Sequence, residues 1–176
     1  MEYMFRDLKA NEIDVRIATI NEKGLSLLLY KDARVDMDIL DETVGEMNWQ
    51  RKHLRDNANC IIEIWDKEKG QWISKEDTGT ESFTEKEKGL ASDSFKRAGF
   101  NWGIGRELYT SPFIWIPAEK CNIKLNTKTN KLMCNDKFVV EAIEITNKVI
   151  TGLAIRNLNK KGEDGKALRV FVYKKG

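Results

Sequence analysis

Two consecutive segments of alternating apolar and polar residues constrain the fold of this chain most strongly. They are NCIIEIWD (59–66) and QWISKEDT (71–78), and the polar link Lys67-Glu68-Lys69-Gly70 joins them. Alternation with a period of two is typical of a half-buried β-strand, and a four-residue link ending in glycine suits a β-hairpin. The pair therefore predicts a hairpin whose apolar face must be covered by another element.

The segment 88–106, KGLASDSFKRAGFNWGIGR, predicts the helix that covers this face. At 100° per residue, four apolar residues fall within about 60° of one another. These residues are Ala91, Phe95, Ala98 and Trp102. On the opposite side Phe100 lies between Lys96 and Arg97, and an aromatic ring beside cations is a layout that single-strand binders use.

The same basic face has a plainer interpretation, which periodicity alone favours. Lys96 and Arg97 then serve solubility, Arg97 pairs with Asp93, and Phe100 packs under a neighbouring element.

The first third of the chain predicts three further elements. Residues 9–20 carry isoleucines at helical spacing and predict a short amphipathic helix, and 24–33 predicts a strand. Residues 33–45 predict a helix with Gly45 as its C-cap. Residues 80–89 predict a loop and a helix start, where Thr84 and Glu87 have the spacing of a capping box.

The last third predicts an antiparallel meander. Its strands are 139–146, 148–155 and 167–173, with a polar loop over 157–166 between the last two. Residues 111–120, with their two prolines, predict an extended connector. We therefore expect an α+β fold with a hairpin, a central helix and a C-terminal antiparallel sheet, in a single domain over residues 1–176.

Composition limits the functions that this chain can have. The 176 residues carry a net charge of only +2, so a nucleic-acid surface must come from local clustering of Lys and Arg. The cysteines Cys60, Cys121 and Cys134 lack zinc-ligand spacing with the lone His53, which predicts reduced thiols and no metal. No apolar run approaches about 18 residues, so we expect a cytoplasmic protein without membrane contact.

Catalytic chemistry has little support in the sequence. Asp32, Asp36 and Glu76 are candidate ligands of a metal-dependent nuclease, although a solvated helix face explains such carboxylates more simply. No GxSxG, P-loop or GxGxxG motif occurs, and any Ser or Cys nucleophile would depend on His53. We expect no enzyme and no cofactor.

Four motifs occur in the order of one protein family. They are Arg34-Val35, the set Gly45, Asn48 and Trp49, the run Glu76-Asp77-Thr78-Gly79, and Asp93, Lys96, Arg97 and Ala98 with Gly103. Residues 24–110 thereby resemble the single-strand annealing proteins of homologous recombination. The likeness is to the eukaryotic mediator Rad-fifty-two and to its bacteriophage relatives, the Sak-type annealing proteins, whereas residues 120–176 form an extension outside the eukaryotic likeness.

The resemblance implies a β-β-β-α core that assembles into rings or filaments and binds single-stranded DNA. Such proteins anneal complementary strands without ATP, so homo-oligomers and a single-strand DNA-binding protein are further expected partners, in the cytoplasm of a bacterial host. By position, Arg34, Lys96 and Arg97 would contact the phosphate backbone. Phe100, and Lys88 and Arg106 near the two ends of the helix segment, complete the predicted DNA-binding set.

Two departures from the eukaryotic pattern stand out. Those proteins have another arginine where this chain has Phe100, so a phosphate contact is either missing or replaced by stacking. The segment before the helix, GTESFTEKEKG, lacks the lysine-rich stretch that gives a second DNA site there, so the resemblance does not supply one.

Overall fold

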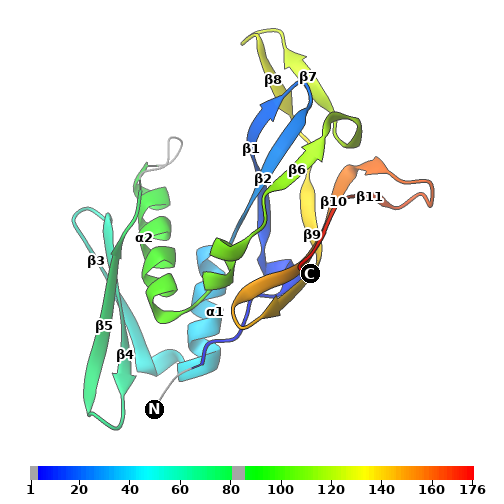
Figure 1. Ribbon diagram of the computed structural model, residues 1–176. Coiled ribbons are helices and arrows are strands. Elements are labelled where there is room, and N and C mark those ends of the chain that lie inside the picture. The colour runs from blue at the N-terminus through cyan, green and yellow to red at the C-terminus, as the bar shows by residue number, and fades with distance from the viewer. Residues whose placement is uncertain (1–3, 81–85) are drawn as a thin grey trace. The chain divides into compact units, whose positions relative to one another are not determined.

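The chain forms two compact units, each assembled from discontinuous segments (Figure 1). The computed structural model describes residues 4–80 and 86–176, except for the side chains of 86–88. Unit 1 comprises Met1–Asp7 and Asp32–Arg106, and unit 2 comprises Leu8–Lys31 and Glu107–Gly176. Both helices belong to unit 1, and the sheets are antiparallel, so the α+β class is confirmed.

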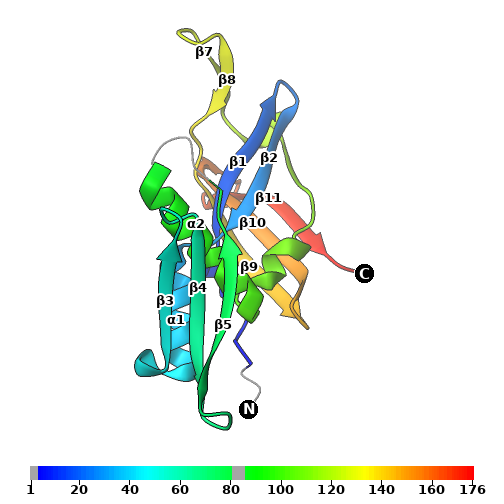
Figure 2. The ribbon, with the colours of Figure 1, turned by 90° about the vertical axis from the view of Figure 1, so that its left-hand side faces the viewer.

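Unit 1 is a three-stranded antiparallel sheet packed against two helices. Its elements are α1 (Ala33–Val44), the 3-10 turn η2 (Glu46–Asn48), β3 (Trp49–Leu54), β4 (Asn59–Asp66), β5 (Gln71–Thr78) and α2 (Lys86–Trp102). The strand order is β3-β4-β5, and α2 contacts β4, β5 and α1. Figure 2 looks onto the sheet with both helices behind it.

The core of unit 1 follows from the alternation in the predicted hairpin. Cys60, Ile62 and Ile64 are buried on one face of β4, and each buried aliphatic side chain contributes about 1.5–3 kcal/mol. Phe95 of α2 is fully buried against this face, and its ring stacks on Trp49 with a centroid separation of 6.1 Å. The hairpin and its covering helix are therefore confirmed.

Unit 2 consists of two three-stranded sheets and a projecting hairpin. Its elements are η1 (Ala10–Glu12), β1 (Asp14–Asn21), β2 (Gly24–Tyr30), β6 (Ile114–Pro117), η4 (Ala118–Lys120), β7 (Ile123–Asn126), β8 (Lys131–Cys134), β9 (Phe138–Thr146), β10 (Val149–Lys161) and β11 (Ala167–Lys174), and η3 (Arg106–Thr110) leads into it. The strand orders are β1-β2-β6 and β11-β10-β9, with β7-β8 separate. Contacts of β1 with β9 and of β6 with β11 join the two larger sheets.

The predicted helix over residues 9–20 is wrong, because β1 occupies most of this range. A β-bulge between Ile17 and Thr19 shifts the strand by one residue. Ile17 then pairs with Leu27 and Ile20 pairs with Leu25, so two isoleucines three positions apart share one face. The bulge thus reproduces the spacing of a helix within a strand.

The predicted extended connector and the predicted loop both contain strand. Ile114 and Ile116 are buried in β6, which pairs with β2 at the sheet edge where a proline at the strand end is tolerated. Strand β10 continues to Lys161, into the predicted loop 157–166. It can do so because the buried Asn157 side chain donates to the Lys120 carbonyl and to Asp136.

Other boundaries agree with the sequence. The predicted strand 24–33 and helix 33–45 correspond to β2 and α1, and Gly45 (φ 86°) ends α1 with its N–H donating to the Asp41 carbonyl. The meander strands are β9, β10 and β11. Thr84 of the predicted capping box lies outside the described residues, as does the side chain of Glu87.

Candidate nucleic-acid interface

The start of α1 gathers opposite charges around one carboxylate. Asp32 is the N-cap, and its side chain accepts a hydrogen bond from the backbone N–H of Arg34 at 2.8 Å. The Arg34 guanidinium also binds this carboxylate, with Nε 3.0 Å and Nη2 3.1 Å from the two oxygens. Because the Arg34 side chain is 82% exposed, its charge stays accessible to a ligand in solvent.

Lys96 on α2 belongs to the same charge cluster. Hydrogen bonds from the Arg34 side chain and backbone, with a smaller contribution from the charge of Lys96, lower the pKa of Asp32 to about 2. Arg34 thus binds the Asp32 carboxylate directly, and Lys96 acts on it through its charge, so two residues that the sequence assigned to DNA influence one anionic group. We call Asp32, Arg34 and Lys96 the α1 charge cluster, and it carries a net charge of +1.

Arg97 lies on the β5 side of α2. Its Nε is 3.6 Å from Oδ1 of Asp77, and this buried Nε has no hydrogen-bond partner among the described residues. The side chain as a whole is 42% exposed. Asp93 does not take the role of its partner, since Asp93 accepts hydrogen bonds from Thr80.

Three other predicted DNA-binding residues have different surroundings. Phe100 is half-buried, and its carbonyl accepts a hydrogen bond of 2.6 Å from Nε of Arg106. Arg106 also donates to the Asn101 carbonyl at 3.0 Å, so its guanidinium binds two carbonyls at the C-terminal end of α2. The side chain of Lys88 lies outside the described residues.

The predicted core face of α2 is only part of its buried surface. Phe95 and Ala98 are fully buried, whereas Ala91 and Trp102 are half-buried. Leu90, Ser94 and Gly99 are buried as well, because Gly79 passes close to Leu90 and Ser94 and Asp36 of α1 packs against Gly99. At Gly99 a Cβ would lie 2.4 Å from Oδ1 of Asp36, so this glycine allows the two helices to approach closely.

The run Glu76-Asp77-Thr78-Gly79 holds α2 against the sheet. Asn101 donates to the Glu76 carbonyl at 2.8 Å and to the Asp77 carboxylate at 3.2 Å. A Cβ on Gly79 would lie 2.5 Å from the backbone nitrogen of Ser94, so the chain passes the helix where only glycine fits. These residues have structural roles that the sequence motif did not specify.

The set Gly45, Asn48 and Trp49 connects α1 to the sheet. Asn48 donates its side-chain amide to the Val44 carbonyl at 2.7 Å, which satisfies a carbonyl in the last turn of α1. The Trp49 indole donates to the Asp41 carboxylate at 2.6 Å. Strand β3, which no alternating pattern in the sequence predicted, begins here.

Strand β3 shows no alternation of apolar and polar residues, because two positions on its inner face hold polar residues. Arg51 pairs with Ile62 and His53 with Cys60, opposite the buried residues of β4. The Arg51 guanidinium lies over the Phe95 ring, 4.8 Å from its centroid. A cation–π contact thus replaces the apolar side chain that an alternating pattern requires.

The structure does not assemble the residues of the nuclease alternative. Asp32 is paired with Arg34, Asp36 packs against Gly99, and Glu76 accepts a hydrogen bond from Asn59. Among the described residues, no group of three or more His, Cys, Asp or Glu side chains could hold a metal ion.

In the described part of the chain, one serine–histidine contact bears on nucleophilic catalysis, and it joins Ser94 to His53. Ser94 Oγ lies 3.4 Å from Nδ1 of His53, but Ser94 is fully buried and donates to the Asn57 carbonyl at 2.9 Å. Burial and the charge of Arg51 lower the pKa of His53. This contact ties α2 to the β3–β4 turn rather than exposing a nucleophile.

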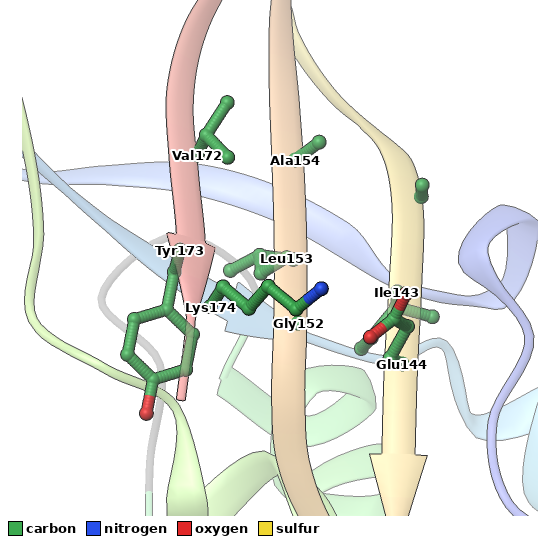
Figure 3. Close-up of a pocket in the computed structure, with 9 residues that line it drawn as sticks. Ile143, Glu144, Gly152, Leu153, Ala154, Val172, Tyr173 and Lys174 are labelled. Atoms are coloured by element: carbon green, nitrogen blue, oxygen red, sulfur yellow. The ribbon is translucent and has the colours of Figure 1, made fainter. Parts of the chain in front are cut away.

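A shallow hollow of about 170 Å³ lies on the β9-β10-β11 sheet of unit 2 (Figure 3). Its floor is made of small and apolar residues, and Glu144 and Lys174 are its charged members. Figure 3 shows the Lys174 side chain extending across Gly152 toward the strand of Glu144. None of the six residues predicted to bind DNA lines this hollow.

Comparisons with known proteins do not indicate a function for this chain. No family model, no curated protein and no solved structure matches this chain. In the part of the chain that the structure describes, no helix has the length and apolar character needed to cross a bilayer.

Proposed function

We propose that this protein binds single-stranded DNA through the α1 charge cluster and Arg97, and that it anneals complementary strands without ATP. Arg34 and Lys96 contact the phosphate backbone, and the half-exposed Arg97 extends the cationic surface along α2. Annealing breaks and forms no covalent bond, so the protein only has to hold the backbones while the base edges remain free to pair.

The Asp32 carboxylate, which Arg34 binds and on which the charge of Lys96 also acts, is the observation that carries this proposal. These cations come from separate helices, yet both act on one carboxylate. The N-terminus of α1, with its partial positive charge, points to the same place. Two cations and a helix N-terminus form a local anion-binding surface in a chain whose net charge is only +2.

The order of elements in unit 1 supports the family resemblance behind the proposal. Three antiparallel strands, β3 to β5, are followed by α2, which is the β-β-β-α order that the resemblance implies. The motif residues Gly45, Asn48, Trp49 and Gly79 have roles in packing these elements. Strand β2, although inside the resembling range 24–110, belongs to unit 2.

Oligomerisation completes the proposed mechanism. A single small cluster gives weak binding, but subunits in a ring or filament would align one cluster each along a strand, so that the contacts add up. We propose such a homo-oligomer, acting in the cytoplasm of a bacterial host in phage-type recombination, with a single-strand DNA-binding protein as a further partner.

Binding and annealing by matched variants test the proposal. The wild-type protein is mixed with labelled complementary oligonucleotides without ATP, and duplex formation is followed by energy transfer. The double variant Arg34→Gln/Lys96→Gln should bind more weakly on all sequences and show a shallower salt dependence. The control Lys67→Gln/Lys69→Gln changes the charge equally at the exposed β4–β5 turn.

Three outcomes contradict the proposal. Equal binding by both double variants would remove the α1 charge cluster from the interface. Wild-type protein that does not bind single strands would end the proposal altogether. Shortened labelled strands in the presence of Mg²⁺ would replace annealing with the nuclease alternative.

A further inference from the structure

The β7–β8 hairpin of unit 2 concentrates positive charge without any compensating carboxylate. Residues 123–134 contain three lysines and neither Asp nor Glu. The three are Lys124 on β7, Lys128 in the turn and Lys131 on β8, and each is exposed. Figures 1 and 2 show that the hairpin projects beyond the ends of β1, β2 and β6 within the same unit.

Strand pairing sorts the side chains of this hairpin onto two faces. Ile123 pairs with Cys134 and Leu125 with Leu132, so one face is apolar. Lys124 pairs with Met133, while Lys131 pairs with Asn126, so the two strand lysines are diagonal neighbours on the other face. Diagonal neighbours are about 7–8 Å apart, a separation at which like charges repel unless an anion lies between them.

The base and the turn of the hairpin are held by hydrogen bonds. Asp136 accepts from the Asn122 backbone and side chain, at 2.8 Å each, and from Asn157 at 2.7 Å. Burial alone would raise the pKa of Asp136, but the hydrogen bonds from Asn122 and Asn157 outweigh it and lower the pKa. The Asn126 side chain accepts from the backbone of Lys128 and so fixes the turn. Asp136, which follows the hairpin in the sequence, is thus occupied with amide donors.

We propose that this hairpin is a second contact for single-stranded nucleic acid, in which Lys124, Lys128 and Lys131 bind backbone phosphates. A polyanion with regularly spaced charges neutralises the three lysines together, which no carboxylate of the hairpin does. The turn residues Thr127, Lys128, Thr129 and Asn130 are all polar, and Leu125, 53% exposed, is too little apolar surface for insertion into a lipid bilayer. The inference rests on the proposed function, since it extends single-strand binding from unit 1 to unit 2.

The salt dependence of binding measures this contact directly. Each phosphate contact to a single strand contributes about 0.7 to the slope of log K against log salt concentration, so three contacts contribute about 2. Between 50 and 200 mM NaCl the affinity of the wild-type protein should therefore fall about 20-fold more than that of Lys124→Gln/Lys128→Gln/Lys131→Gln. Fluorescence anisotropy of a labelled oligo-dT gives both affinities.

A control triple variant separates a local contact from a change in net charge. Lys161→Gln/Lys166→Gln/Lys175→Gln removes the same charge from exposed positions of unit 2. This control should retain the wild-type slope, and thermal unfolding should be equal for the two triple variants. Equal slopes for both triples and the wild type would overturn the inference.

Two further measurements separate a failure of the hairpin contact from a failure of the proposed function. If the wild-type protein binds oligo-dT and only the Arg34→Gln/Lys96→Gln variant has a reduced slope, the hairpin contact is wrong while the proposed function stands. If the wild-type protein does not bind oligo-dT, the proposed function fails first. Loss of binding to phosphatidylserine vesicles by the hairpin variant, with oligo-dT binding unchanged, would reassign the hairpin to membranes.

Discussion

Removing the negative charge of Asp32 should strengthen binding to single-stranded DNA. The substitution is Asp32→Asn, which retains a good N-cap for α1 because asparagine caps as well as aspartate. The lost ion pair joins an Arg34 side chain 82% exposed to an Asp32 side chain 44% exposed, so solvent screening limits its contribution. We expect the free energy of unfolding to fall by about 0.2–1 kcal/mol.

The expected gain in affinity follows from Coulomb's law. A phosphate bound by Arg34 and Lys96 at roughly 8 Å from the Asp32 carboxylate is repelled by about 0.5–1 kcal/mol at an effective dielectric constant of about 40–80. Removing the charge should therefore tighten binding about 2–5-fold per subunit.

The pH dependence of this gain is a second, independent check. The lowered pKa of Asp32, about 2, keeps its carboxylate ionised from pH 5 to 8, so the gain should be constant over that range. The depressed pKa also means that the stabilisation from this ion pair is present above the unfolded pKa, near 4, and is lost as the pH falls through about 2.

Anisotropy titrations of wild-type protein, Asp32→Asn and Glu163→Gln measure these effects. Glu163 is an exposed acid of unit 2, so Glu163→Gln makes the same change in net charge outside the cluster. Weaker or unchanged binding by Asp32→Asn would refute a phosphate site at the cluster. An equal gain in both variants would show that only net charge matters.

Three further predictions concern packing, stacking and thiol reactivity. Gly79→Ala should lower the free energy of unfolding by about 1–3 kcal/mol in urea titrations, because its Cβ would lie 2.5 Å from the backbone of α2; an unchanged midpoint would contradict this contact. Phe100→Ala should lose about 1–3 kcal/mol of binding if the ring stacks on bases, whereas loss of melting temperature with binding intact would assign it to the core. Burial raises the pKa of all three thiols, and to about 11 for Cys60 and Cys121. Because Cys60 and Cys121 are buried and Cys134 is only half-buried, a maleimide at pH 8 should label Cys134 first, as mass spectrometry would show; rapid labelling of all three before denaturation would be inconsistent with this structure.

Local sequence patterns determined the elements of unit 1 that interact mainly with near neighbours. The alternation in 59–78 specified β4 and β5, and the stripe of residues including Ile39, Leu40 and Val44 specified α1. A period of two or of 3.6 can be seen within ten residues, since it reflects which side of one element is buried. The β1 bulge gave a strand the spacing of a helix, so the pattern predicted the wrong element there. In β3 the polar Arg51 occupies an inner position, so the alternating pattern was absent.

The candidate interface depended on contacts between distant segments. The sequence identified Arg34, Lys96, Arg97 and Arg106 as cations, but their partners come from the tertiary structure. Packing of α1 on α2 lets the charge of Lys96 act on Asp32, the carboxylate that Arg34 binds, whereas Arg106 binds the carbonyls at the end of its own helix. The sequence alone thus determined which residues could bind an anion. Only the tertiary structure decided which of them share one surface, because a side chain's partners are set by long-range packing.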